Sequence, residues 1–266
     1  MGLGHVAKQV LFRAVPNAVI KAGTAVSEGR RSEVKIIQAL APRSSIALDI
    51  GASFGLYTYI LAKHAAKVEA FEPNPRKAAY LRSLSLPNCD IFEVALSHRS
   101  GQADLVVPLR ETACATIEPE HPLANVHGEG LTRIGVALRS LDDFQFENVG
   151  FAKIDVEGHE LSVLRGGLRL LQRDQPILFV EIERRHNPLG FQQIFPFLAD
   201  LGYRAYSCSH RKVSAIRNFD VAKDQSPDDL ANGIKKGSYI YNFLFIPNNN
   251  ETTLDELSAA DFEIVL

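Results

Sequence analysis

The chain has 266 residues, 46% of them hydrophobic, which is enough apolar material for one large α/β domain with its own core. Its net charge of −2 provides no basic surface, so we expect no nucleic-acid partner. Three cysteines without a C-x-x-C pair argue against a disulfide framework or a zinc site and favour a reducing, cytoplasmic location. No apolar run approaches about 18 residues, so no transmembrane segment is predicted.

From residue 46 onward, short apolar runs typical of buried strands alternate with segments typical of helices. The expected strands are 46–50, 67–72, 90–95, 151–156, 177–183, 203–208 and 241–246. The expected helices are 55–65, one that opens at Pro75, 158–171 and 191–201. Because strands that alternate with helices pair in parallel, this order predicts a mostly parallel sheet with helices on both faces.

The stretch 97–139 interrupts the alternation. Two β segments, 103–107 and 134–138, flank a polar loop, so we predict a hairpin-like insertion. The expected divisions of the chain are 1–44 as an N-terminal helical segment, 45–247 as the main domain and 248–266 as a polar C-terminal tail.

The turn after the first strand has the pattern D-x-G-x-x-x-G, which begins at Asp49 and contains Gly51 and Gly55. Glycines at such positions let the backbone turn tightly and approach a ligand closely. The second strand ends at Glu72, which Pro73 follows. An acid at this point of a β-α-β unit accepts hydrogen bonds from both hydroxyls of a ribose. A nucleoside-bearing cofactor is therefore predicted across the first two strands.

The kind of cofactor follows from a residue that differs from the dinucleotide pattern. Dinucleotide sites carry G-x-G-x-x-G, whose middle glycine admits a pyrophosphate against a helix N-terminus. Ser53 stands in that position, so a cofactor without phosphates fits better, and S-adenosylmethionine (SAM) is the common one. The alternative is a tight strand–helix turn beside an incidental surface glutamate.

Two further predicted strands end in carboxylates, Asp155 and Glu181. A charge in an apolar strand is costly unless it is paired, hydrogen-bonded or used, and ligands bind at the carboxyl ends of such strands. We therefore expect Asp155 and Glu181 to face each other beside the methyl group of the cofactor. The alternative is that Lys153 or Arg184 neutralises them in a salt bridge. His159, which follows the fourth strand, is a further candidate base or a solvated capping residue.

The chain resembles the FkbM family of class I SAM-dependent methyltransferases over residues 45–247. The resemblance rests on the ordered motifs L-D-I-G-A-x-x-G-x-Y-T, A-F-E-P-N-P, V-A-L-S, R-S-L-D-D, K-I-D-V-E-G-H-E-L-x-V-L-R-G and F-V-E-I-E. It implies a Rossmann-like α/β fold with a seven-stranded, mostly parallel sheet, and O-methylation of a sugar, polyketide or related small-molecule hydroxyl. The cofactor contacts that it implies are Asp49, Gly51, Ser53 and Gly55 for SAM, Glu72 with Pro73 for the ribose, and Glu93 to Ala95 for the adenine. One departure is Ser53, where family members often have Asn.

We therefore predict a SAM-dependent O-methyltransferase that acts on a small-molecule hydroxyl. Such a hydroxyl needs a base to take its proton, or a divalent cation such as Mg²⁺ to stabilise the alkoxide. Asp155 is the first candidate for either role, Glu181 its partner and His159 the reserve. The sequence does not separate a base from a metal ligand.

Two other classes share parts of this pattern. An NAD-dependent Rossmann oxidoreductase has the same β-α-β start but needs the missing glycine. A non-catalytic SAM-binding protein needs no acids at the fourth and fifth strands. The loop 108–133 matches no pattern of the family, so the identity of the acceptor would be written there, and its His121 and His127 alone do not make a metal site.

Overall fold

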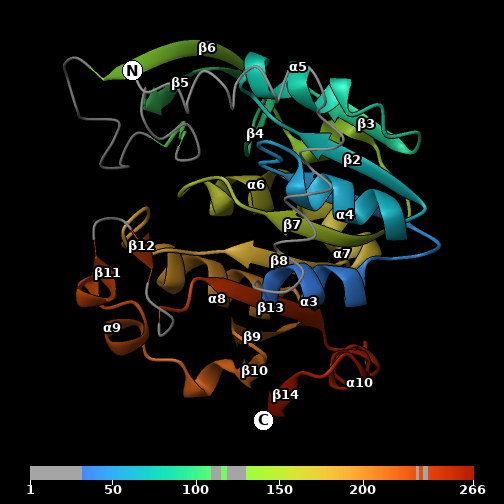
Figure 1. The fold of residues 1–266 in the computed structure, drawn as a ribbon, viewed down its shortest axis with the longest axis vertical. Coiled ribbons are helices and arrows are strands. Elements are labelled where there is room, and N and C mark those ends of the chain that lie inside the picture. The colour runs from blue at the N-terminus through green and yellow to red at the C-terminus, as the bar shows by residue number, and fades with distance from the viewer. Residues whose placement is uncertain (1–31, 109–114, 119–129, 232–233, 236–238) are drawn as a thin grey trace, which may run out of the picture.

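The computed structural model describes residues 32–108, 115–118, 130–231, 234–235 and 239–266 (Figure 1). Within this part of the chain, nine strands form the main sheet. In spatial order they are β3 (Cys89–Phe92), β2 (Lys67–Phe71), β1 (Ile46–Ile50), β7 (Val149–Ile154), β8 (Ile177–Glu181), β13 (Asn242–Pro247), β9 (Tyr203–Ser209), β10 (Lys212–Ala215) and β14 (Glu263–Val265).

The direction of these strands confirms the predicted mostly parallel sheet. The strands β3, β2, β1, β7 and β8 all run parallel, whereas β13 pairs antiparallel with both β8 and β9. The first seven strands correspond to the seven expected ones. The strands β10 and β14 extend the sheet further, with β14 at its edge. They were not expected because three or four residues carry too little periodicity to be recognised.

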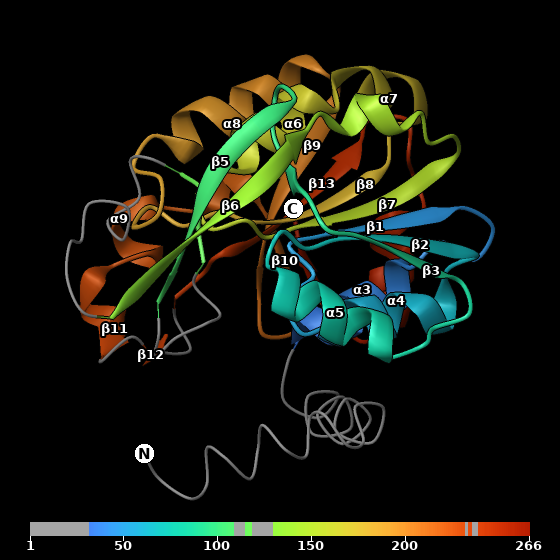
Figure 2. The ribbon, with the colours of Figure 1, turned by 90° about the horizontal axis from the view of Figure 1, so that it is seen from above.

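Helices cover both faces of the main sheet (Figure 2). One face packs against α3 (Ser32–Leu40), α4 (Leu56–His64), α5 (Pro75–Ser83) and α10 (Thr253–Ala259), and the other against α6 (Glu160–Gly166), α7 (Leu168–Asp174) and α8 (Gly190–Asp200). Because side chains alternate along a strand, Phe151 and Phe179 pack on the first face. Their neighbours Ala152 and Leu178 pack on the second.

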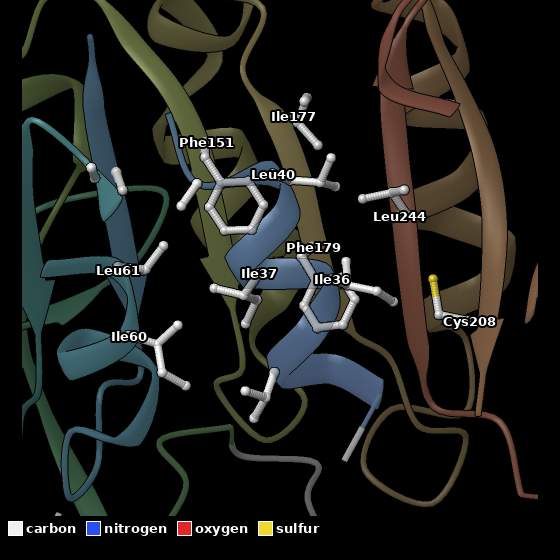
Figure 3. Packing of buried hydrophobic residues seen from close by; sticks show 14 of the residues in the cluster. Ile36, Ile37, Leu40, Ile60, Leu61, Phe151, Ile177, Phe179, Cys208 and Leu244 are labelled. Carbon is white, nitrogen blue, oxygen red and sulfur yellow. The ribbon is translucent and has the colours of Figure 1, made fainter. Parts of the chain in front are cut away.

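The short helix α3 contributes to the core of the first face (Figure 3). Its Ile36, Ile37 and Leu40 are buried, and they point toward Phe151 and Phe179 of the sheet. Part of the predicted N-terminal helical segment is therefore packed on the main domain. The rest of that segment, 1–31, lies outside the described residues.

The insertion forms a second, smaller sheet of β4 (Ala95–Leu96), β5 (Gly101–Pro108) and β6 (Leu131–Arg139). The strands β5 and β6 pair antiparallel over their whole length, which confirms the predicted hairpin, and β4 pairs parallel with β6. This sheet has its own small core of Ala95, Leu105, Val107 and Val136. Elsewhere, β11 (Leu230–Ala231) and β12 (Ile234–Lys235) form a short pair beside α9 (Val221–Asp224). None of the helices in the described ranges is long and apolar enough to cross a membrane.

The predicted helix 158–171 is instead two helices, α6 and α7, that meet at Gly167. A Cβ atom on Gly166 would lie 2.0 Å from the carbonyl oxygen of Ser97, and one on Gly167 would lie 2.8 Å from Leu141. The two glycines let other chain segments approach closely at this point. The break therefore follows from tertiary contacts that the leucine periodicity does not contain.

Candidate active site

A cavity of about 180 Å³ lies at the carboxyl ends of β1, β2, β7 and β8. In the sheet, β1 lies between β2 on one side and β7 on the other, so the strand order reverses at β1. Ligands of open α/β sheets bind at such a reversal. Eight of the predicted site residues line the cavity: Gly51, Ser53, Glu72, Pro73, Ala95, Asp155, His159 and Glu181. The described lining leaves out Asp49, Gly55 and Glu93.

Backbone contacts within the protein fix the conformation of the turn after β1. Gly51 has φ of +81°, and a Cβ atom there would lie 1.9 Å from the backbone oxygen of Asp155. The backbone N–H groups of Gly51 and Ala52 both donate to the carbonyl oxygen of Phe71, at 3.0 Å. Glycine is therefore required at position 51 by the close approach of the ends of β1 and β7, whether or not a ligand binds there.

Backbone N–H groups of two segments, the turn after β1 and the residues after β2, position the side chain of Glu72. Its Oε2 accepts a hydrogen bond from the N–H of Ser53 and its Oε1 one from the N–H of Asn74, each at 2.8 Å. Ser53 adopts a left-handed conformation, with φ of +51°, that aims its N–H at this carboxylate. Burial raises the pKa of Glu72, and the charge of Lys77 opposes that rise. The carboxylate thus faces the cavity in a fixed orientation.

Three charged residues form a chain from the core to the cavity. Asp49 and Lys153 lie opposite each other on β1 and β7, and the Nζ atom of Lys153 is 4.0 Å from Oδ1 of Asp49 and 3.0 Å from Oδ2 of Asp155. The hydroxyl of Thr58 donates to Oδ2 of Asp49 at 2.5 Å. Burial raises the pKa of Asp49, whereas for Lys153 the two carboxylates outweigh burial and raise the pKa of the ammonium.

Asp155 lies at the cavity and is also paired with Lys153, so features of both expectations are present. Asp155 lines the cavity, as does Glu181 at the end of the neighbouring strand β8. Lys153 also pairs with Asp155, as the salt-bridge alternative required. Asp49, by contrast, is fully buried, so it reaches the cavity only through Lys153. Lys153 stabilises the negative charge of Asp155, and its Nζ lies 4.7 Å from the ring centroid of Tyr57.

Both ring nitrogens of His159 contact the protein. Its Nδ1 lies 2.8 Å from Oε2 of Glu118, and its Nε2 lies 2.9 Å from Oγ of Ser97. The ring therefore joins the insertion, through Glu118, to the end of β4, through Ser97. Action as a base would require His159 to exchange one of these contacts for the acceptor.

Glu157 is a cavity residue that the sequence reasoning missed. It lines the cavity in a left-handed conformation, with φ of +53°, beside Gly158. Among the described residues its Oε2 has no hydrogen-bond partner, although Nδ1 of His186 lies 3.1 Å away. Burial, with the charges of Asp155 and Glu183, raises the pKa of Glu157 to about 8. The available signal was the motif D-V-E-G, whose glutamate precedes a glycine at the end of a strand.

The remaining predicted residues lie apart from the cavity lining. Glu93 is exposed and pairs with Arg82 at 2.8 Å. Gly55 begins α4 with φ of +81°, where a Cβ atom would come within 2.6 Å of Leu81. Their proposed cofactor contacts stay predictions.

The rest of the lining consists of Lys77 and a set of apolar residues, most of which were also missed. These apolar residues are Ile50, Phe71, Val94, Leu96, Leu105, Ala115, Ile117 and Val156. Leu105, Ala115 and Ile117 belong to the insertion, and the last two lie in the loop 108–133, where recognition of the acceptor was expected. In the described ranges there is no group of three or more His, Cys, Asp or Glu side chains that could hold a metal ion. The loop residues His121 and His127 lie outside those ranges.

The order of the main sheet, with β13 antiparallel in an otherwise parallel centre, and the cavity at its carboxyl edge define an α/β protein with a class I methyltransferase-like fold. Residues 49–205 match the model of the methyltransferase FkbM domain, and the chain belongs to that family, as its motifs predicted. A crystal structure of methyltransferase FkbM from Methylobacillus flagellatus has the same fold, with a TM-score of 0.50 and 16% identity over 77% of this chain and 44% of that one.

Two curated relatives are similar over about half of the chain. The hexuronic acid methyltransferase AglP of Haloferax volcanii is 25% identical over 155 residues, which cover 54% of this chain and 59% of the relative. Methyltransferase 1 of Beauveria bassiana is 27% identical over 148 residues, which cover 47% of this chain and 59% of the relative. The matches thus span little more than half the length of these relatives.

Proposed function

We propose that the protein is a SAM-dependent O-methyltransferase that transfers a methyl group to a hydroxyl of a small molecule such as a sugar. The observation that carries the proposal is the cavity at the carboxyl edge of the sheet in a member of the methyltransferase FkbM domain family. Glu72 lies on one side of this cavity, and the carboxylates of Asp155, Glu157 and Glu181 lie where β7 and β8 end.

The residues around Glu72 fit the adenosyl part of SAM. Each carboxylate oxygen accepts one backbone N–H and keeps a second lone pair for a ribose hydroxyl. Pro73, Val94 and Ala95 provide an apolar surface beside it, which suits the adenine ring. No pyrophosphate is needed at Ser53, whose N–H is already bonded to Glu72.

The carboxylates at β7 and β8 supply the other half of the chemistry. SAM provides an electrophilic methyl group on a sulfonium, and transfer to an alcohol requires that the alcohol lose its proton. Asp155 is held by Lys153 on a rigid strand end, so it can orient the hydroxyl and accept its proton, with Glu181 beside it. His159 is the weaker candidate because both its nitrogens are engaged. If the reaction uses Mg²⁺, Asp155 is the first ligand to consider.

A sugar is the first acceptor to test because one similar protein is described as a hexuronic acid methyltransferase. The carboxylates of this cavity would repel an acidic group, so a neutral hydroxyl fits the described lining better than a uronate carboxylate.

The test has two stages. Calorimetry should detect binding of SAM and S-adenosylhomocysteine (SAH) and no binding of NADH, which tests the cofactor class. The protein is then incubated with trideuteromethyl-SAM and a panel of neutral and acidic glycosides, and products are analysed by mass spectrometry. A label that survives mild alkali marks an ether, and a label lost there marks an ester. Absence of SAH binding, or NADH binding instead, would contradict the proposal.

A further inference from the structure

The cavity lining has two chemically different parts. Its apolar part includes Val94, Ala95 and Leu96, which follow β3, together with Leu105, Ala115 and Ile117, whereas the carboxylates of Asp155, Glu157 and Glu181 lie where β7 and β8 end. The β5–β6 hairpin lies at one end of the long axis of the molecule, and β8 lies nearer its middle (Figure 1).

Three of the apolar lining residues come from the insertion, and they are packed on its own core. Leu105 of β5 is buried in that core together with Ala95 of β4. Ala115 and Ile117 pack against the same core but remain half-buried, and they line the cavity. We call Leu105, Ala115 and Ile117 the insertion wall.

The segment that carries Ala115 and Ile117 is hydrogen-bonded both to the small sheet and to the turn after β7 of the main sheet. Thr116 exchanges backbone hydrogen bonds with Val106 of β5, at 2.9 and 3.1 Å. The Thr116 hydroxyl donates to the carbonyl oxygen of Glu157 at 2.9 Å, and Glu118 contacts the ring of His159 at 2.8 Å. The wall is thus a built part of the cavity, because it is attached to the turn after β7 as well as to the hairpin.

The position of Glu72 assigns a ligand group to this wall. A ribose bound at Glu72 directs its base either toward the apolar part or toward the carboxylates. Adenine is a flat aromatic ring that gains free energy in an apolar enclosure, whereas the sulfonium and an alcohol suit the carboxylate part. The backbone N–H of Glu72 donates to the carbonyl oxygen of Phe92 at 3.0 Å, which places the segment that continues into Val94 and Ala95 beside Glu72.

We infer that the insertion wall encloses the adenosyl part of SAM, so that the insertion is a cofactor-binding element and not solely an acceptor-recognition loop. This inference rests on the proposed function. The contacts of Thr116 with Glu157 and of Glu118 with His159 hold the segment that carries Ala115 and Ile117 in place at the cavity.

The test measures cofactor affinity and needs no acceptor. Ile117→Ala should weaken binding of SAH about tenfold in calorimetry, the loss expected when two or so methylene groups leave an apolar contact. The same factor should appear for 5′-methylthioadenosine, which shares the adenosyl group but lacks the amino-acid part. Ala115→Leu, which adds bulk to the wall, should also weaken both ligands and serves as an independent variant.

Val107→Ala is the matched control. Val107 is buried in the same small core but does not line the cavity, so its truncation should leave SAH affinity within about twofold. Unchanged SAH affinity in both wall variants would overturn the inference. An equal loss in the Val107 variant would also overturn it, because the effect would then be one of hairpin stability. Failure of the wild type to bind SAH would instead remove the proposed function itself.

Discussion

At the scale of single residues, Lys153 controls the electrostatics beside the cavity. It is buried between Asp49 and Asp155, and the two carboxylates hold its charge in the interior. A buried charge that loses its partner is far more costly than one that never entered the core. Asp155 is therefore a structural partner of Lys153 and also, in the proposed reaction, the first candidate for the base.

Asp155→Asn should separate these two roles. Asparagine keeps the shape of the side chain but neither accepts a proton nor binds a divalent cation well, so turnover should fall by about 10²-fold or more. SAH affinity, measured by calorimetry, should change little. Addition of EDTA to the wild type then distinguishes a metal ligand, whose loss of activity magnesium restores, from a base, which is indifferent. Near-normal turnover in the variant would make Asp155 purely structural.

Glu72→Gln tests the ribose assignment. Charge-assisted hydrogen bonds are worth about 1.5–3 kcal/mol each, so SAM and SAH, which share the ribose, should both bind at least about tenfold more weakly. The amide would also place an NH₂ group against one of the N–H groups of Ser53 and Asn74. Glu69→Gln is the control: Glu69 is buried on β2, three residues before Glu72, and pairs with Lys67 away from the cavity. A loss for SAM alone would mean that Glu72 recognises the sulfonium.

At the scale of elements, the small sheet is joined to the main domain through α6. Gly166 of α6 approaches the backbone at Ser97, and the hydroxyl of Ser140 donates to the carbonyl oxygen of Gly166 at 2.6 Å. The helix end, the end of β4 and the start of the turn after β6 therefore meet at one glycine. This contact sets the position of β4, whose residues Ala95 and Leu96 line the cavity.

Gly166→Ala should destabilise the protein even though alanine favours helices. The added Cβ would lie 2.0 Å from a backbone oxygen, so α6 or β4 must shift, at a cost of about 1–3 kcal/mol or more in the free energy of unfolding. Gly135→Ala is the matched control, because a Cβ on that β6 residue meets no atom within 4 Å. Urea denaturation of both variants measures the difference. Equal stability of the two would show that the contact at Ser97 is readily relaxed.

At the scale of the whole molecule, two apolar layers hold the sheet, and the C-terminal segment closes one of them. Leu257 of α10 and Phe262 are buried in the layer that contains α3 and α4. The predicted polar tail thus contributes a helix and the edge strand β14. Against this apolar background, buried carboxyl groups near the cavity make the stability of the fold depend on pH.

The stability should fall as the pH rises from about 5 to 8. Burial raises the pKa of Glu157 to about 8 and that of Glu160 to about 7, from an ordinary value of 4.5. Between these values the folded protein binds protons that the unfolded chain has released, so the stabilisation is complete below pH 4.5 and is lost as the pH rises through the folded pKa.

Glutamine does not titrate, so replacement of Glu157 or Glu160 by glutamine removes its part of this loss of stability at high pH. The difference in unfolding free energy between Glu157→Gln and wild type should increase by roughly 1–3 kcal/mol between pH 5 and pH 9, and Glu160→Gln should show the same direction. Urea denaturation at several pH values provides the measurement. A difference that stays constant with pH would mean that Glu157 is ionised in the folded protein at neutral pH.

Much of the fold was readable from local patterns. The alternation of apolar runs with helical segments predicted the main sheet, and the spacing of β segments around a polar loop predicted the β5–β6 hairpin. Local patterns did not predict the break at Gly167, the strand β10 or the edge strand β14. Each of them depends on contacts with other segments of the chain.

The amino-acid sequence alone was enough to predict the family, the order of the strands along the chain and the position of Glu72 after the second strand. These features depend on residues that are close together along the chain. Only the tertiary structure decided which carboxylate is compensated by Lys153, that Glu157 joins the cavity, and that the insertion contributes Leu105, Ala115 and Ile117 to its wall. Charge pairing and burial act through space between strands that are distant in sequence. Their outcome is therefore set by how β1, β7 and the hairpin come together, which no single segment encodes.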